Sequence, residues 1–141
     1  MNFKEYFSET TLRQYAPVLL RLSLSGVFVW FGTSQLLDAG SWTGFVPEFV
    51  PRLSGISAVS LVHVNGGFEV IAGSLLAIGM FPRLLALLLS LHLLGITASI
   101  GLTALGIRDL GLALAALAVA MQGADAWSLA SAAEPPPDSS R

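Results

Sequence analysis

Residues 84–94 read LLALLLSLHLL, and this nearly unbroken apolar run decides the fold class. It lies within residues 83–102, a stretch about as long as the roughly 20 residues that a helix needs to cross the hydrocarbon core of a bilayer. The run lacks the alternation of apolar and polar residues that is typical of a membrane β-strand. It therefore predicts a transmembrane α-helix, because inside lipid only helices and closed barrels satisfy the backbone polar groups.

Three further stretches have the same character, namely residues 17–37, 60–81 and 107–123. Pro82 separates the second span from the third, and the short stretch 103–106 separates the third from the fourth. Connections this short place consecutive helices side by side and antiparallel. The sequence predicts an all-α membrane protein, with four transmembrane helices in an up-down bundle and a short interfacial segment between helices 1 and 2.

The composition agrees with this fold class and excludes several functions. Of the 141 residues, 54% are hydrophobic and 11% are charged, with a mean hydropathy of +0.74, whereas about 25% of the residues of a soluble domain are charged. A soluble enzyme and a disordered chain are thus excluded, and a net charge of -2 without a basic stripe excludes a nucleic-acid partner. The absence of cysteine excludes disulfides, thiolate metal sites and a cysteine nucleophile, and no motif assigns metal ligands.

The remaining segments divide the chain into three parts. We expect an interfacial N-terminal segment at residues 1–16, the four-helix domain at 17–124 and a flexible C-terminal tail at 125–141. Residues 38–59 are too rich in proline and polar residues to span the membrane, yet carry apolar residues at near-helical spacing. They are either a lid over the bundle mouth or a surface loop with aromatic anchors.

Basic residues set the expected orientation. With both termini in the cytoplasm, the basic residues on the inner side would be Lys4, Arg13, Arg21, Arg83 and Arg141, and those on the outer side Arg52 and Arg108. This excess on one side predicts a multi-pass protein of the cytoplasmic membrane with both termini inside.

Two ionisable residues fall near the middle of predicted spans, where charge is costly and indicates function. They are Glu69 in the second span and His92 in the third, and Asn65 lies one helical turn from Glu69 on the same face. Further polar residues are expected in the same, outer half of the bundle: Gln35, His63, Arg108 and Asp109. We predict a polar pocket around Glu69 near the bilayer midplane.

Each of these residues also has a purely structural interpretation. Glu69 can tie helices together as a buried carboxyl group, and His92 can be a hydrogen-bonded packing residue. Arg21 can extend to the headgroups or, less favourably, pair with Glu69. Because Arg108 and Asp109 are sequence neighbours on a helix, at most one of them is expected to face the core.

Several motifs, taken together, carry a resemblance to a known family. Residues 19–22 read LLRL and residues 27–32 VFVWFG, residues 65–70 read NGGFEV, and Arg108-Asp109-Leu-Gly opens the last span. In this order and spacing the chain resembles the DoxX family of small four-helix membrane proteins over residues 15–122. The positions that match recurring family residues are Arg21, Gly32, Glu69, Gly73, Arg83 and Asp109.

The resemblance implies a quinone-associated membrane subunit of an oxidoreductase system, since relatives include the membrane subunit of an archaeal thiosulfate:quinone oxidoreductase. The cofactor would then be a quinone, and a soluble or peripheral oxidoreductase partner or a soluble substrate would supply electrons. Glu69, His92 and Asp109 would be the catalytic residues that relay protons. The residues that would bind the substrate are Asn65, Gln35, Arg21, Arg108 and Trp30.

Two functions of other classes stay open, and with them the question whether the protein is an enzyme. The first is a small transporter, permease or lipid-binding membrane protein, which would need a homodimer because four helices enclose little volume. The second is a non-catalytic assembly subunit that uses glycine-rich helix faces as interfaces. In all cases the surrounding partner is the lipid bilayer.

Overall fold

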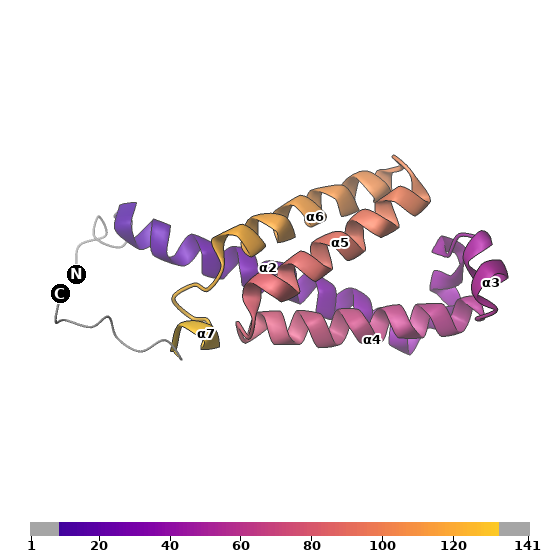
Figure 1. Ribbon diagram of the computed structural model, residues 1–141, viewed down its shortest axis with the longest axis horizontal. Helices are drawn as coiled ribbons and strands as arrows, with labels where there is room; N and C mark the ends of the chain where they lie inside the picture. The colour runs from indigo at the N-terminus through magenta and orange to yellow at the C-terminus, as the bar shows by residue number, and fades with distance from the viewer. Residues whose placement is uncertain (1–8, 133–141) are drawn as a thin grey trace.

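The computed structural model describes residues 9–132, and every regular element within them is a helix (Figure 1). Four of the helices are long and apolar enough to cross a membrane, which confirms the predicted all-α fold with four spans. They are α2 (Glu9–Leu37), α4 (Ala58–Ala77), α5 (Pro82–Ile100) and α6 (Ala104–Gln122). The shorter elements are η1 (Ala39–Phe45), α3 (Phe49–Ser54) and α7 (Leu129–Ala132).

Each of the two short connections ends at a residue that starts the next helix, α5 or α6. Phe81 has a left-handed φ of 48°, and Pro82 begins α5 at a position where its missing N–H costs nothing. The Thr103 side chain accepts a hydrogen bond from the backbone N–H of Gly106 at 3.1 Å. This cap begins α6 at Ala104, three residues before the predicted start of the last span.

Helix α2 differs from the expectation at its N-terminal end. Residues 9–16 continue in the same helix as the first span, with Pro17 inside it, whereas the sequence suggested a separate segment over residues 1–16. Proline is tolerated within transmembrane helices because neighbouring groups and local adjustments satisfy the freed backbone carbonyl. Residues 1–8 of the expected segment lie outside the described residues.

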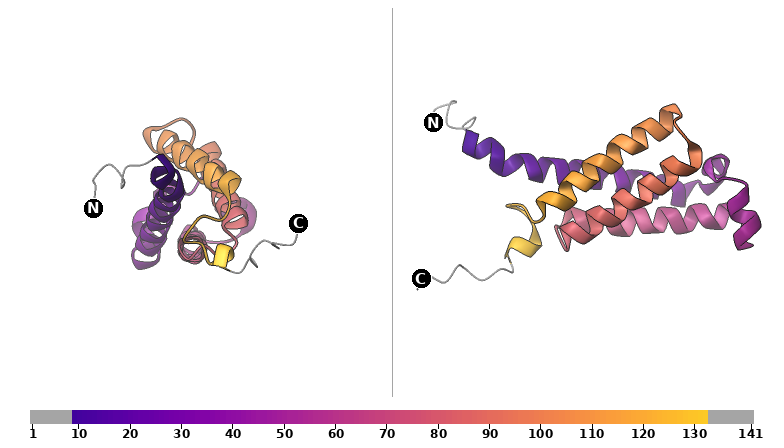
Figure 2. Two further views of the ribbon diagram at one scale, coloured as in Figure 1. Left: turned by 90° about the vertical axis from the view of Figure 1, so that its left-hand side faces the viewer. Right: turned by 45° about the horizontal axis from the view of Figure 1, so that its top comes forward.

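The long helices form two closely packed pairs, α2 with α4 and α5 with α6. A Cβ atom added at Gly32 of α2 would lie 2.6 Å from the carbonyl oxygen of Gly66 in α4, so the two backbones touch. In the second pair, the Ser90 hydroxyl donates to the Ala113 carbonyl at 2.8 Å. Consecutive helices are antiparallel as predicted, but α4 packs mainly on α2, and it diverges from α5 toward the end where α3 lies (Figures 1 and 2).

The tightest core lies in the half of the bundle near α7, which we call the α7 end. Leu76, Ala86, Leu89 and Ala116 have no exposed surface there, where the α4–α5 turn meets the last turns of α6. Interdigitated small and branched side chains fill the space between the two pairs. The opposite half, the α3 end, is where the two pairs separate.

The segment between α2 and α4 covers the α3 end of the bundle (Figure 2). Val46 and Val50 face inward and line a cavity, whereas Phe49 and Leu53 are 56% and 84% exposed. The Trp42 ring packs edge-on against Phe31 of α2, with centroids 5.7 Å apart. The segment thus presents apolar residues on both its inner and its outer side, and the inner ones close the bundle mouth.

Part of the expected C-terminal tail is packed against the bundle. Backbone N–H groups of Leu129 and Ala130 donate to the carbonyls of Ile78 and Gly79 at 3.1 and 3.2 Å. These bonds hold α7 against the α4–α5 turn. Residues 133–141 lie outside the described residues.

Candidate functional site

A cavity of about 870 Å³ lies at the α3 end, between the two helix pairs. Apolar side chains from all four long helices and from residues 42–50 make up most of its wall. The polar side chains that line it are Gln35, Asn65, Glu69, His92, Ser99, Arg108 and Asp109. An apolar cavity with a few convergent polar groups is the usual form of a small-molecule site.

Four of these side chains, Gln35, Asn65, Glu69 and His92, form one hydrogen-bonded group that we call the Glu69 cluster. The Glu69 carboxylate accepts hydrogen bonds from Gln35 Nε2 at 3.0 Å and from Asn65 Nδ2 at 3.1 Å. His92 Nε2 lies 3.2 Å from Glu69 Oε1. Asn65 Nδ2 also donates to Gln35 Oε1 at 2.7 Å, so the cluster joins three helices.

Local packing explains why these side chains meet. Asn65 and Glu69 are four residues apart and therefore share one face of α4. Gly66 lies between them in sequence, and its lack of a side chain lets α2 approach; a Cβ there would be 3.0 Å from the Cβ of Gln35. The glycine contact thus places the Gln35 amide within bonding distance of the Glu69 carboxylate.

His92 completes the cluster from the other helix pair. Its ring lies 4.9 Å from the ring of Phe68, centroid to centroid, and its side chain is 19% exposed, against 5% for Glu69. Among the described residues its hydrogen bonding involves Nε2 only, so Nδ1 is left for another group. Nδ1 can therefore take part in a hydrogen bond with a ligand while the carboxylate holds the other ring nitrogen.

Arg108 and Asp109 form a second polar group on the cavity wall. The Arg108 Nε donates to Asp109 Oδ1 at 2.8 Å, and the guanidinium carbon lies 4.7 Å above the Phe31 ring. Of the two, only Asp109 is buried in the core, as expected, but Arg108, whose side chain is 43% exposed, also borders the cavity. The reason is that the long Arg108 side chain folds back over its neighbour's carboxylate.

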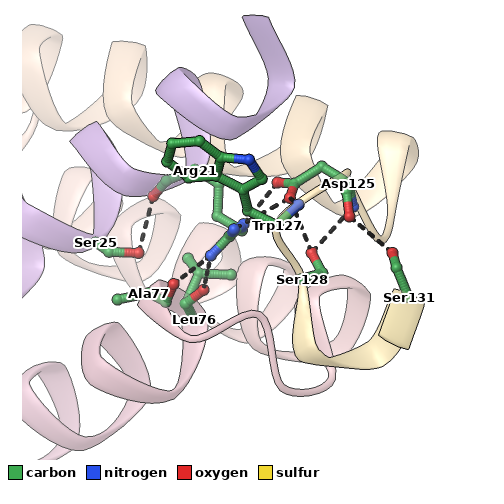
Figure 3. Close-up of polar contacts among 8 residues, drawn as sticks. All are labelled: Arg21, Ser25, Leu76, Ala77, Asp125, Trp127, Ser128 and Ser131. Carbon is green, nitrogen blue, oxygen red and sulfur yellow. Dashed lines mark hydrogen bonds and ion pairs between the residues drawn. The ribbon is translucent and has the colours of Figure 1, made fainter. Parts of the chain in front are cut away.

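Arg21, a predicted binding residue, lies away from this cavity in a group that we call the Arg21 cluster (Figure 3). Its Nε donates to Asp125 Oδ2 at 2.6 Å and its Nη2 to Asp125 Oδ1 at 3.1 Å. Its Nη1 donates to the carbonyls of Leu76, at 2.9 Å, and Ala77. The guanidinium thereby ties α2 to the C-terminal end of α4 and to the segment after α6.

Asp125 is the partner of Arg21 that sequence reasoning missed, because it was assigned to the flexible tail. Burial raises the pKa of Asp125, but hydrogen bonds from Arg21 and the Trp127 N–H and the Arg21 charge outweigh it, and the net pKa is lowered. The Ser128 hydroxyl also donates to the carboxylate, at 3.1 Å. The available signal was Arg21 itself, because an arginine inside a span needs an acidic partner at similar depth.

Two other predicted positions are separate from the cavity. Trp30 is 64% exposed and packs edge-on against Phe31, outside the cavity wall. His63, placed with the polar residues of the outer half, is exposed and does not line the cavity. Both side chains sit on the outward-facing sides of their helices.

Comparison with known proteins is consistent with this fold. The family model of DoxX matches residues 16–104, which runs from the first span to the start of α6 and includes every member of the Glu69 cluster. Arg108 and Asp109 lie beyond the matched residues. Searches of the curated proteins and of the solved structures each gave no match. The match covers more than half of the sequence, and the chain is therefore a member of the DoxX family of membrane proteins.

Proposed function

We propose that the protein is a quinone-binding membrane subunit of an oxidoreductase system, with the cavity at the α3 end as its quinone site. The observation that carries this proposal is the Glu69 cluster at the wall of a mostly apolar cavity. Glu69 and His92 lie near the middle of α4 and α5, so the polar groups sit at hydrocarbon depth. A ligand that reaches them comes from the membrane and carries few hydrogen-bonding atoms.

The shape and chemistry of the cavity suit a quinone ring. Its volume of about 870 Å³ falls within the usual range for small-molecule sites. Phe31, Trp42 and Phe68 offer ring faces and edges to a flat conjugated ring. Gln35 Nε2 has two N–H groups and donates one to Glu69, which leaves the other for a ring carbonyl.

The pairing of His92 with Glu69 suits proton exchange. A bound quinone would supply two-electron redox chemistry that takes up two protons on reduction. His92 donates from Nδ1 when its ring is protonated and accepts at Nδ1 when its ring is neutral with hydrogen on Nε2. In both states the Glu69 carboxylate holds the Nε2–H, so the ring keeps its orientation while a proton moves at Nδ1.

Electrons must reach the site from outside this chain. The sequence has no cysteine, which excludes an iron–sulfur cluster held by its own thiolates. A soluble or peripheral oxidoreductase partner, or a soluble reduced substrate, is the donor under this proposal. The role of the chain is then to hold the ring and supply its protons.

A binding titration in lipid nanodiscs tests the proposal. Trp42 lines the cavity, so we expect a benzoquinone to quench its fluorescence saturably, and the Trp42→Phe variant to lose that component. Glu69→Gln should weaken binding by about tenfold, because the amide that replaces the carboxylate accepts at one oxygen only, so Gln35 and His92 cannot both keep their bonds and hold the ring, and one such bond is worth about 0.5–1.5 kcal/mol. The matched control is Glu9→Gln, whose carboxylate is 79% exposed and bonds only to Arg13 among the described residues.

Three kinds of result would contradict or replace the proposal of a quinone site. Absence of saturable quenching in the parent protein, or equal affinity in Glu69→Gln, would contradict quinone binding at this site. Uptake of a solute by proteoliposomes that requires Glu69 and no redox partner would favour a transporter instead. Copurification of an oxidoreductase without any dependence on Glu69 would favour an assembly subunit.

A further inference from the structure

The wall of the cavity is not equally closed on all sides. Between α2 and α6, Arg108 lies over the Phe31 ring and bridges the gap. At the α3 end, Trp42 and its neighbours in residues 42–50 form a cover. Toward the α7 end, Phe28 and Leu93 are 2% and 5% exposed and close the floor.

The side between α4 and α5 is different. Val64 of α4 and Leu91 of α5 both line the cavity, yet they are 70% and 57% exposed. A residue that lines a cavity and also contributes this much outer surface lies at the rim of an opening. Leu91 is at the midpoint of α5, so the opening faces the hydrocarbon core of the bilayer.

Gly95 keeps this opening wide. It lines the cavity from α5, one turn after His92, and a Cβ built on it meets nothing within 4 Å. Side chains on a helix lean over the preceding turn, so any larger residue at position 95 would extend toward Leu91 and across the rim. Its φ is ordinary for a helix, so backbone conformation does not require glycine there.

We propose that the ligand of this cavity is a lipid quinone with a long hydrocarbon tail, which enters and leaves between α4 and α5 and whose tail extends past Gly95 into the bilayer. The inference rests on the proposed quinone site and adds to it the ligand class and the route. The polar ring end lies against the Glu69 cluster, and the tail leaves through the side of the cavity where the exposed Val64 and Leu91 form the rim. Passage of the tail from free lipid to the rim costs little free energy, because the side chains of the rim are as apolar as the acyl chains.

The route is tested with two probes that share one ring: a benzoquinone with a long isoprenoid tail and the same benzoquinone without a tail. Affinities are measured in nanodiscs by quenching of Trp42 and expressed per lipid, so that partition of the tail into lipid cancels. The series Gly95→Ala, Gly95→Leu and Gly95→Phe narrows the opening in steps. The matched control is Gly111→Phe, an exposed helical glycine outside the cavity wall whose added Cβ also meets nothing within 4 Å.

We expect affinity for the tailed probe to fall progressively along the series, by about tenfold or more at Gly95→Phe, while affinity for the tail-free probe changes less than about threefold. Gly111→Phe should leave both affinities unchanged. Equal losses for both probes at Gly95→Phe, or no loss for either, would overturn the proposed route. Failure of the parent protein to bind the tail-free ring would instead remove the quinone site itself, so the two failures are distinguishable.

A photoreactive tail provides an independent readout. A benzoquinone with a diazirine in the first part of its tail should label peptides of α4 and α5 around Val64 and Leu91. Labelling confined to α2 and α6 would show that the tail leaves by the other side and would overturn the inference.

Discussion

The two halves of the bundle treat buried polar side chains in opposite ways. At the α7 end, the side chains of Arg21 and Asp125 are 1% and 3% exposed, and each nitrogen of the guanidinium donates to an oxygen of the chain. At the α3 end, the Glu69 cluster faces a cavity of about 870 Å³. His92 there keeps a ring nitrogen that bonds to none of the described residues.

This difference indicates how charged side chains that stabilise a membrane bundle can be distinguished from those that are available to a ligand. A buried ion pair whose every group is satisfied by the chain has no bond left for a ligand and acts on the folded state alone. A group that is held on one side and free toward a cavity is available for chemistry. Depth in the membrane does not separate the two kinds, because both clusters lie within or beside spans.

The largest expected effect comes from breaking the Arg21 cluster. Arg21→Met removes the cation and leaves the Asp125 carboxylate buried without its partner, which should cost about 3–5 kcal/mol of unfolding free energy. Denaturation in mixed micelles measures the loss. Glu69→Gln provides the comparison at the other end, where loss of hydrogen-bond acceptance should cost only about 1 kcal/mol.

Removal of both partners sharpens this test. The double variant Arg21→Met with Asp125→Leu should be less destabilised than the sum of the two single variants, because neither charge is left unpaired. Additive losses would mean that the two side chains contribute independently. A loss below about 1 kcal/mol for Arg21→Met would put this pair in the class of weak surface ion pairs.

A smaller effect is expected where the α2–α4 contact supports the cavity. Gly32→Ala places a methyl group 2.6 Å from the Gly66 carbonyl oxygen and 2.9 Å from the Glu69 Cβ. The helices must separate, at a cost of about 1–3 kcal/mol, and quinone affinity should fall because Gln35 moves away from Glu69. Thermal unfolding and the nanodisc titration measure the two effects.

The control for this contact lies six residues earlier on α2. Gly26→Ala adds a methyl group with nothing within 4 Å, and the helix should be unchanged or slightly more stable. Equal behaviour of the two variants would mean that α2 and α4 do not touch at Gly32.

The smallest effect is a pH dependence that arises from Asp125 at the α7 end. Because the folded-state pKa of Asp125 is below its ordinary value of 3.8, the ion pair stabilises the fold above that pH. The contribution is lost as the pH falls below this value and through the lower folded-state pKa. Melting temperatures measured on the acid side should therefore drop less in Asp125→Asn than in the parent protein, whereas an equal drop would assign the acid sensitivity to other carboxylates.

The sequence predicted the features that depend on local composition. Hydropathy over about 20 residues located the four spans, and proline at position 82 located a boundary, because both act within one segment. Helical rise placed Glu69 and His92 at similar depth for the same reason. The start of α6 was placed late because the Thr103 cap is a side-chain bond that hydropathy does not register.

The Glu69 cluster was predicted only in part from the sequence. Its members were expected in one half of the bundle, but their contacts depend on the rotation of α2 about its axis. That rotation is fixed by the meeting of Gly32 with Gly66, which are on different helices. Arg21 illustrates the limit, because sequence-based reasoning offered the headgroups or, less favourably, Glu69 as its partner, and its partner in the fold is Asp125.

What the sequence by itself determined is therefore the membrane-spanning character of each long helix and the relative depth of Glu69 and His92 within their spans. The tertiary structure alone decided that α2 pairs with α4, that Arg21 bonds to a carboxylate 104 residues away, and that a cavity remains at the α3 end. The physical reason is that lipid selects segments one at a time by their hydropathy, whereas packing between helices depends on the shapes of side chains that sequence separation keeps far apart.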